Sequence, residues 1–72
     1  MLVRDSADLA VAVTQARKSL GLSQQELADL AEVSVRSISA LESGFSSMGF
    51  SKLMSILSVL GLSLRVEVTP IG

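Results

Sequence analysis

The chain has 72 residues, 49% of them hydrophobic and 18% charged, and its six Lys or Arg against seven Asp or Glu give a formal net charge of -1. This length allows one domain with one small core, which must be aliphatic because Trp and Tyr are absent and Phe occurs twice. The absence of Cys and His excludes disulfides, thiolate metal sites and the commonest general base, so we expect no enzyme, no metal and no cofactor.

The amino terminus and the size of the chain give two further expectations. The amino-terminal stretch "MLVRDSADLA" has an acidic residue at position 5, which is not typical of a signal peptide. No apolar run reaches the ~18 residues of a membrane span. We therefore expect a soluble, cytoplasmic protein with no signal peptide and no membrane partner. Domains below about 70–80 residues bury little surface on their own, so oligomerisation is expected as well.

The first two helices are predicted from apolar residues at helical spacing with start and stop signals around them. The first has Ser6 as its N-cap and ends before Gly21. The second begins at Gln24, because "SQQE" from Ser23 to Glu26 is a capping box, and it should end near Glu32. The expected inward residues are Leu9, Ala12, Val13, Ala16, Leu20, Leu27, Ala28 and Ala31, with Leu30 partly buried.

Two more helices follow. Ser34 caps the third, which runs to about Ser43 and stops at Gly44, and "SKLMSILSVLG" over residues 51–61 forms the fourth. Their expected inward residues are Ile38, Leu41, Leu53, Ile56, Leu57 and Leu60. In the loop between them, Phe45, Met48 and Phe50 are expected to fill the gap between the two helices, the alternative being an exposed loop that binds a partner.

The segment "LSLRVEV" changes from helical spacing to strict alternation, which predicts a strand over about residues 62–69. A lone strand leaves backbone groups unpaired, so we expect it to pair antiparallel with a second copy about a two-fold axis at Val66. Leu64 then lies opposite Val68, and Arg65 opposite Glu67. The alternative is pairing with residues 1–3 of the same chain. The residues of the proposed dimer strand are Leu62, Leu64, Arg65, Val66, Glu67 and Val68.

The second and third helices, over about residues 23–43, have the spacing of a helix-turn-helix, in which the second helix of the pair enters the DNA major groove. That helix carries one long cation, Arg36, placed where a guanidinium can bind O6 and N7 of guanine. Small residues beside it, Ser39 and Ala40, would allow close approach to the bases. Any helical bundle contains a helix pair, so this geometry alone is weak evidence for DNA binding.

The string "LSQQELADLAEVSVRSISALESG" resembles the Xre/Cro-type helix-turn-helix family of phage and bacterial repressors, in the order Leu, Ser, Gln, Leu-Ala, Val-Ser, Ile-Ser, Glu and Gly. The continuation "LMSILSVLGLSLRVEV" is similar to HipB-like antitoxins, which end in a dimerising strand and repress their own operon together with a HipA-type kinase toxin. The resemblance implies an all-α, four- to five-helix, lambda-repressor-like domain over residues 1–72, closed by a strand across a dimer.

The resemblance also implies roles for individual residues. Arg17 and Glu42 match a buried structural ion pair that joins the first helix to the end of the third. Gln24 matches a glutamine that binds a DNA phosphate, although a solvated first-turn residue would look the same, and capping alone would explain Ser34. The implied base-reading residues are Val35, Arg36, Ser39 and Ala40, and the implied phosphate contacts are Gln24, Ser34, Ser37, Ser43, Ser46, Ser47 and Lys52.

Several positions depart from the family pattern. Glu32 stands where the family prefers Gly, which predicts a left-handed residue or an altered turn. Val35 and Ala40 replace polar readers, so recognition would depend on Arg36 and on contacts with thymine methyls. Because most phosphate donors here are neutral, we expect a shallow dependence of binding on salt.

The sequence thus favours an autoregulating repressor that binds double-stranded DNA as a homodimer on a palindromic operator, as the antitoxin of a HipBA-like pair with a kinase toxin. A second hypothesis is a protein-interaction module that neutralises a partner without reading DNA, which the net negative charge, Val35 and Ala40 favour. An enzyme is the least supported, because no His or Cys is present and the carboxylates have other roles.

Overall fold

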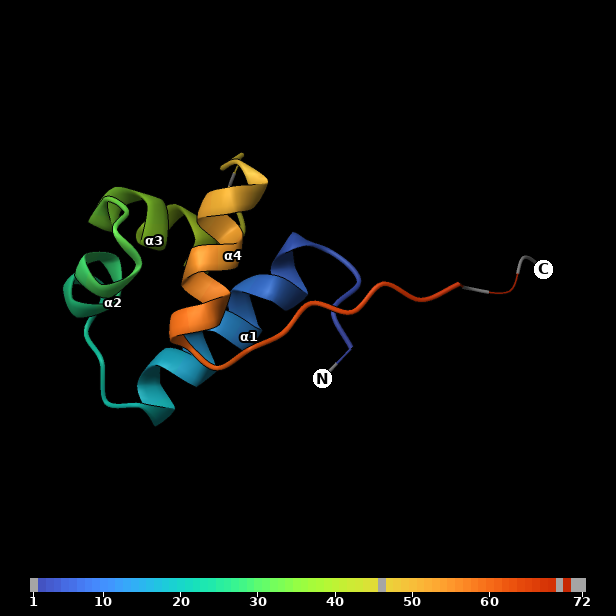
Figure 1. Cartoon of the computed structure of the whole chain (residues 1–72), viewed down its shortest axis with the longest axis horizontal. Helices are drawn as coiled ribbons and strands as arrows, with labels where there is room; N and C mark the ends of the chain where they lie inside the picture. Colours follow the sequence, from blue (N-terminus) through green and yellow to red (C-terminus); the bar gives the residue numbers. More distant parts are fainter. Residues whose placement is uncertain (1, 46, 69, 71–72) are drawn as a thin grey trace.

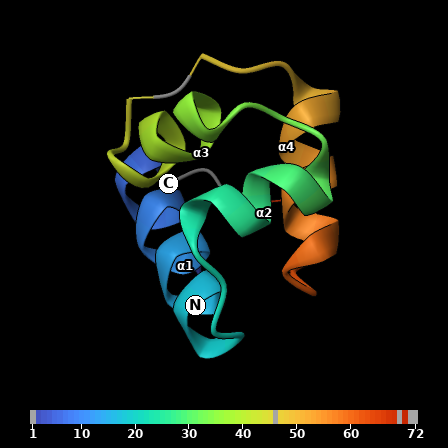
Figure 2. The ribbon, with the colours of Figure 1, turned by 90° about the vertical axis from the view of Figure 1, so that its left-hand side faces the viewer.

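The computed structural model describes residues 2–45, 47–68 and 70. Within this part of the chain it contains helices and no strand (Figure 1). The helices are α1 (Ser6–Ser19), α2 (Gln24–Ala31), α3 (Val35–Glu42) and α4 (Phe50–Val59). α3 packs against α1 and α2, and α2 packs against α4. Figure 2 shows α1 and α4 on either side of the α2–α3 pair. The all-α helix-turn-helix fold expected from the sequence is confirmed.

The helix starts follow from side chains that satisfy backbone amides of the first turn. α1 is capped by Asp5 and not by Ser6 as predicted: the Asp5 carboxylate accepts from the Asp8 amide at 2.8 Å. The predicted capping box of α2 is present, with the Glu26 amide donating to Ser23 Oγ at 3.0 Å and the Ser23 amide to Glu26 Oε1 at 2.9 Å. Hydrogen bonds with Ser23 lower the pKa of Glu26 below its ordinary value.

The four helices all end in the same hydrogen-bonded motif, in which a left-handed residue is followed by an apolar one. The left-handed residues are Gly21, Glu32, Gly44 and Gly61. The apolar residue that follows donates its amide to the carbonyl five residues earlier, at 2.9–3.1 Å. The four bonds are Leu22 to Arg17, Val33 to Ala28, Phe45 to Ala40 and Leu62 to Leu57. Such an end turns the chain sharply, and in α2 it sets the angle at which α3 leaves.

The buried core is aliphatic, as expected from the composition. Its members are Ala10, Val13, Leu27, Ala28, Ala31, Ile38, Leu41, Ile56, Leu57 and Leu60. Leu9, Ala12, Ala16 and Leu53 are half-buried at its edge. Two predictions were wrong: Leu20 is 54% exposed because it lies beyond the last turn of α1, and Leu30 is 60% exposed because it falls outside the buried stripe of α2. Ala10 is buried and was not predicted.

Residues 62–68 leave the helical bundle as an extended segment (Figure 1). Leu62 packs against the core, whereas Val66 is 91% and Val68 98% exposed. Among the described residues, no backbone hydrogen bond joins this segment to residues 2 and 3. The alternative, pairing with the amino terminus of the same chain, is therefore not formed there. Pairing across a dimer stays a prediction, and Thr69, at the end of the predicted strand, lies outside the described residues.

Candidate nucleic-acid interface

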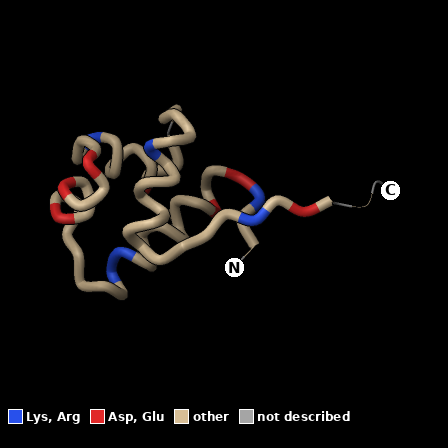
Figure 3. The backbone as a smooth tube through the Cα atoms, in the orientation of Figure 1, with Lys and Arg blue, Asp and Glu red and all other residues tan. Residues whose placement is uncertain are grey.

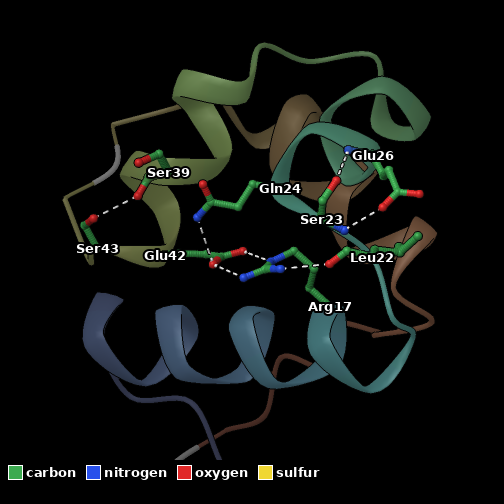
Figure 4. Close-up of polar contacts among 8 residues, drawn as sticks. All are labelled: Arg17, Leu22, Ser23, Gln24, Glu26, Ser39, Glu42 and Ser43. Carbon is green, nitrogen blue, oxygen red and sulfur yellow. Dashed lines mark hydrogen bonds and ion pairs between the residues drawn. The ribbon is translucent and has the colours of Figure 1, made fainter.

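An ion pair ties the end of α3 to α1 (Figure 4). Arg17 Nε lies 2.7 Å from Glu42 Oε2, and Arg17 Nη2 donates to Glu42 Oε1 at 3.0 Å. The side chains are only 12% and 7% exposed. Arg17 Nη1 also donates to the Leu22 carbonyl at 2.8 Å, and Gln24 Nε2 donates to Glu42 Oε1 at 3.1 Å. One carboxylate therefore holds α1, the start of α2 and the end of α3 in register.

Both members of this pair are held in their charged forms. Burial raises the pKa of Glu42, but hydrogen bonds from Arg17 and Gln24, the charge of Arg17 and the Thr14 hydroxyl together keep that pKa below its ordinary value. The hydrogen bond to Glu42 raises the pKa of Arg17. A carboxylate that stays ionised at neutral pH and is saturated with donors is a positioning group, so the pair stabilises the fold and performs no proton transfer.

The turn between α2 and α3 depends on Glu32, which has φ 58° and ψ 44° in the left-handed region. The sequence allowed either a left-handed residue or an altered turn at this position, and the structure has the former. Ser34 then caps α3 by accepting from the Ser37 amide at 3.1 Å. Turn and cap together orient α3 so that Ile38 and Leu41 enter the core.

The outward side of α3 carries the predicted base-reading residues. Val35 is 40% exposed, Arg36 and Ser39 are exposed, and Ala40 is half-buried. Within the described residues Arg36 takes part in no ion pair or hydrogen bond with the protein. Its guanidinium is therefore available to an external acceptor at the amino-terminal end of the helix.

A groove runs from α3 past the following loop to the start of α4. It is lined by Ser34, Arg36, Ser37, Ala40, Phe45, Ser47, Met48 and Lys52. Six of these eight were predicted to contact DNA. The groove does not include Val35, Ser39, Gln24 or Ser43, and Ser46 lies outside the described residues.

Hydroxyl groups near the groove differ in whether they can still donate to a phosphate, which offers only acceptors. The Ser43 hydroxyl already donates to the Ser39 carbonyl at 2.8 Å, so its one proton is occupied. Ser34 and Ser37 share one hydrogen bond of 2.9 Å between their hydroxyls, which leaves one proton between them. Gln24 keeps one amide proton after bonding Glu42. The geometry thus supports Ser43 as a phosphate donor less well than the sequence suggested.

Charged residues are distributed unevenly along the folded backbone (Figure 3). Acids gather on α2 and its C-cap, namely Glu26, Asp29 and Glu32. Between residues 33 and 64 the charged residues are Arg36, Glu42 and Lys52, and Glu42 is neutralised by Arg17. The groove therefore has two cations, Arg36 and Lys52, and no carboxylate among its lining residues, although the chain as a whole carries -1.

The loop after α3 corrects one prediction. Met48 packs against the core as expected, but Phe45 is 85% and Phe50 66% exposed, so neither ring fills the gap between α3 and α4. No signal in the sequence distinguishes Phe45 from Leu22 and Leu62, which also follow a left-handed glycine and are half-buried. Nothing in the sequence placed Phe45 in the groove beside Arg36.

In the described part of the chain, no three His, Cys, Asp or Glu side chains come together so that they could hold a metal ion. None of the helices in that part has the length and apolarity required to cross a bilayer.

A helix pair joined by a tight turn, with its second helix exposed at the amino-terminal end, defines a helix-turn-helix protein. The chain belongs to the helix-turn-helix family, whose model matches residues 13–66. The resemblance to HipB is confirmed by solved structures. A chain of the HipA-HipB-O2-O3 complex is 26% identical, with a TM-score of 0.83 over 97% of this chain and 99% of that one. A chain of the HipB-O4 20mer complex has the same score and coverages at 24% identity. No curated protein matches the sequence significantly.

Proposed function

We propose that this chain is a sequence-specific DNA-binding repressor that inserts the start of α3 into the major groove. The observation that carries the proposal is the positive, carboxylate-free groove beside an unpaired Arg36 on a helix held rigidly by the Arg17–Glu42 pair. Similarity to HipB in its complexes supports it. The groove is where a half-site would lie, because phosphates flank the bases that α3 reads.

Base readout would depend on Arg36, which can bind guanine O6 and N7 in a bidentate manner. Val35 and Ala40 offer methyl and methylene surface to thymine methyls. Lys52, Ser47 and the free proton of the Ser34–Ser37 pair would contact phosphates across the groove. The start of α4 adds backbone donors, since its N-cap is Gly49 and no side chain caps its first turn.

We propose a homodimer closed by antiparallel pairing of residues 62–68, which would place two α3 helices on half-sites about one helical turn apart. The exposed Leu64, Val66 and Val68 support it, because a monomer would leave their apolar surface in water. The Arg65–Glu67 contact within one chain is 3.3 Å long and 83% and 63% exposed, so either residue can exchange its partner for the other copy's at little cost.

The more specific role that we propose is that of an antitoxin that represses its own operon together with a HipA-type kinase toxin. The HipA-HipB complex among the similar structures supports this role. The competing role is a protein-interaction module without DNA readout, which the acidic surface of α2 and the exposed Leu30 favour. Co-purification with the product of a neighbouring kinase-like gene tests the toxin partner.

The decisive experiment is a fluorescence-anisotropy titration of the protein on its own upstream DNA and on scrambled DNA at two salt concentrations. We expect selective binding to the upstream DNA, and we expect Arg36→Ala to lose about 1–3 kcal/mol and most of the selectivity. Lys18→Ala is the matched control, because it removes an exposed cation from the last turn of α1 that does not line the groove. Equal, weak binding to both DNAs would favour the protein-interaction module.

A further inference from the structure

Phe45 is an aromatic ring in water at the edge of the positive groove. It is 85% exposed, yet its backbone is firmly held: the Phe45 amide donates to the Ala40 carbonyl at 3.1 Å, and the Gly44 amide to the Leu41 carbonyl at 3.1 Å. These two hydrogen bonds fix the backbone of Phe45 directly after the end of α3.

The other helix ends show that this exposure is not required by the motif. In each of them the apolar residue after the left-handed position is half-buried: Leu22 after α1, Val33 after α2 and Leu62 after α4. Such a residue ordinarily packs back on its own helix. The Phe45 ring does not pack in this way: it is 85% exposed, so it contributes little to folding.

The residues around the Phe45 ring favour a polyanion as the ligand of the groove. The residues that share the groove include the cations Arg36 and Lys52 and the hydroxyls of Ser34, Ser37 and Ser47, and no carboxylate. A basic protein surface would be repelled here, and a purely apolar partner would bury two cations without counter-charges. The DNA backbone satisfies both demands, because it presents phosphates to the cations and deoxyribose carbons to the ring.

We infer that Phe45 is a DNA-contacting residue whose ring packs on deoxyribose or a thymine methyl at the edge of each half-site, next to the phosphates bound by Lys52. This inference rests on the proposed function. The contact releases no counterions, so it strengthens binding without adding to the salt dependence. It would compensate for the scarcity of cations in this face.

The test is the dependence of operator affinity on salt for wild type, Phe45→Ala, Phe45→Lys and Phe50→Ala. We expect Phe45→Ala to weaken binding about tenfold per half-site with an unchanged slope of log K against log salt. Phe45→Lys should recover affinity at low salt and steepen the slope by about one per half-site. Phe50→Ala is the matched control: its ring is 66% exposed but outside the groove, and the substitution keeps the backbone amide at the start of α4, so affinity should be unchanged.

Thermal unfolding and sedimentation of the same variants complete the test. An unchanged melting temperature for Phe45→Ala, within about 2 °C, is expected because the ring is exposed. If Phe45→Ala binds as tightly as wild type, or if it weakens the dimer instead of the DNA complex, the inference is wrong while the repressor proposal stands. If wild type itself does not select its upstream DNA, the proposed function fails and the inference fails with it.

Discussion

Removing the guanidinium of Arg17 should destabilise this fold more than any surface substitution. In Arg17→Met, Glu42 would keep the Gln24 hydrogen bond at 3.1 Å but lose both bonds to the guanidinium, at 2.7 and 3.0 Å, while only 7% exposed. Removing one partner of a buried pair costs about 3–5 kcal/mol. Because some water reaches the pair and the Gln24 hydrogen bond remains, we expect Arg17→Met to lower the unfolding free energy by about 2–4 kcal/mol at pH 7.

That loss is a large fraction of the total unfolding free energy of a domain of this size. At about 0.05–0.15 kcal/mol per residue, 72 residues give an unfolding free energy of about 4–11 kcal/mol. Urea unfolding followed by far-UV circular dichroism measures the difference from the midpoint and slope. Lys18→Met is the matched control, since this neighbouring cation is exposed and should change stability by less than about 0.5 kcal/mol.

The loss of stability in Arg17→Met should also depend on pH. The pKa of Glu42 is lowered in the folded state, so its contribution to stability is complete above the unfolded value of about 4.3 and is lost as pH falls through the folded value. Once the carboxyl is protonated, Arg17→Met no longer leaves a buried charge. The difference between wild type and variant should therefore shrink below about pH 4.

A double variant distinguishes two causes of the lost stability, an unpaired buried charge and the loss of side-chain packing. Arg17→Met combined with Glu42→Leu removes both charges and should recover much of the stability lost in the single variant. A loss below about 1 kcal/mol for Arg17→Met at pH 7, or one that persists undiminished at acid pH, would refute the assignment of Glu42 as a buried, ionised tie between α1 and α3.

Other substitutions test single features by the same unfolding assay or by sedimentation. Glu32→Gly should raise the unfolding free energy by about 0.5–1 kcal/mol, because glycine adopts φ 58° without a steric penalty, and no gain would argue against a left-handed turn. Ser23→Ala should cost about 1 kcal/mol by removing the acceptor of the capping box, and a neutral result would contradict that hydrogen bond. Val66→Asp should yield monomers in sedimentation with unchanged helical circular dichroism, because two carboxylates would meet at the two-fold axis, and a persistent dimer would place the interface elsewhere.

The helix boundaries were predictable because they depend on hydrogen bonds between residues close in sequence. Ser23 and Ser34 bond amides three residues ahead, and Gly44 ends α3 through its own positive φ. The cap of α1 was assigned one residue late because Asp5 and Ser6 are both competent caps, and the choice between them depends on the extended backbone at Asp5.

Six of the eight residues that line the candidate groove were named from the sequence, but their arrangement was not. Arg17 and Glu42 are 25 positions apart and were paired through the family resemblance, since no local pattern joins them. The occupied proton of Ser43 and the bond from Gln24 to Glu42 depend on atoms that meet only in the folded chain. The net charge of -1 pointed away from DNA, whereas the structure brings Arg36 and Lys52 into one groove whose lining contains no carboxylate.

The sequence by itself thus determined the four helices of the described chain, the caps of α2 and α3, the aliphatic core stripe and the helix-turn-helix pattern. These features follow from contacts within a few residues and from burial of apolar side chains. Only the tertiary structure decided that one carboxylate joins α1, α2 and α3, and that Phe45 stands outside the core beside Arg36 and Lys52. Such relations depend on the packing angle between helices, which no short stretch of sequence encodes.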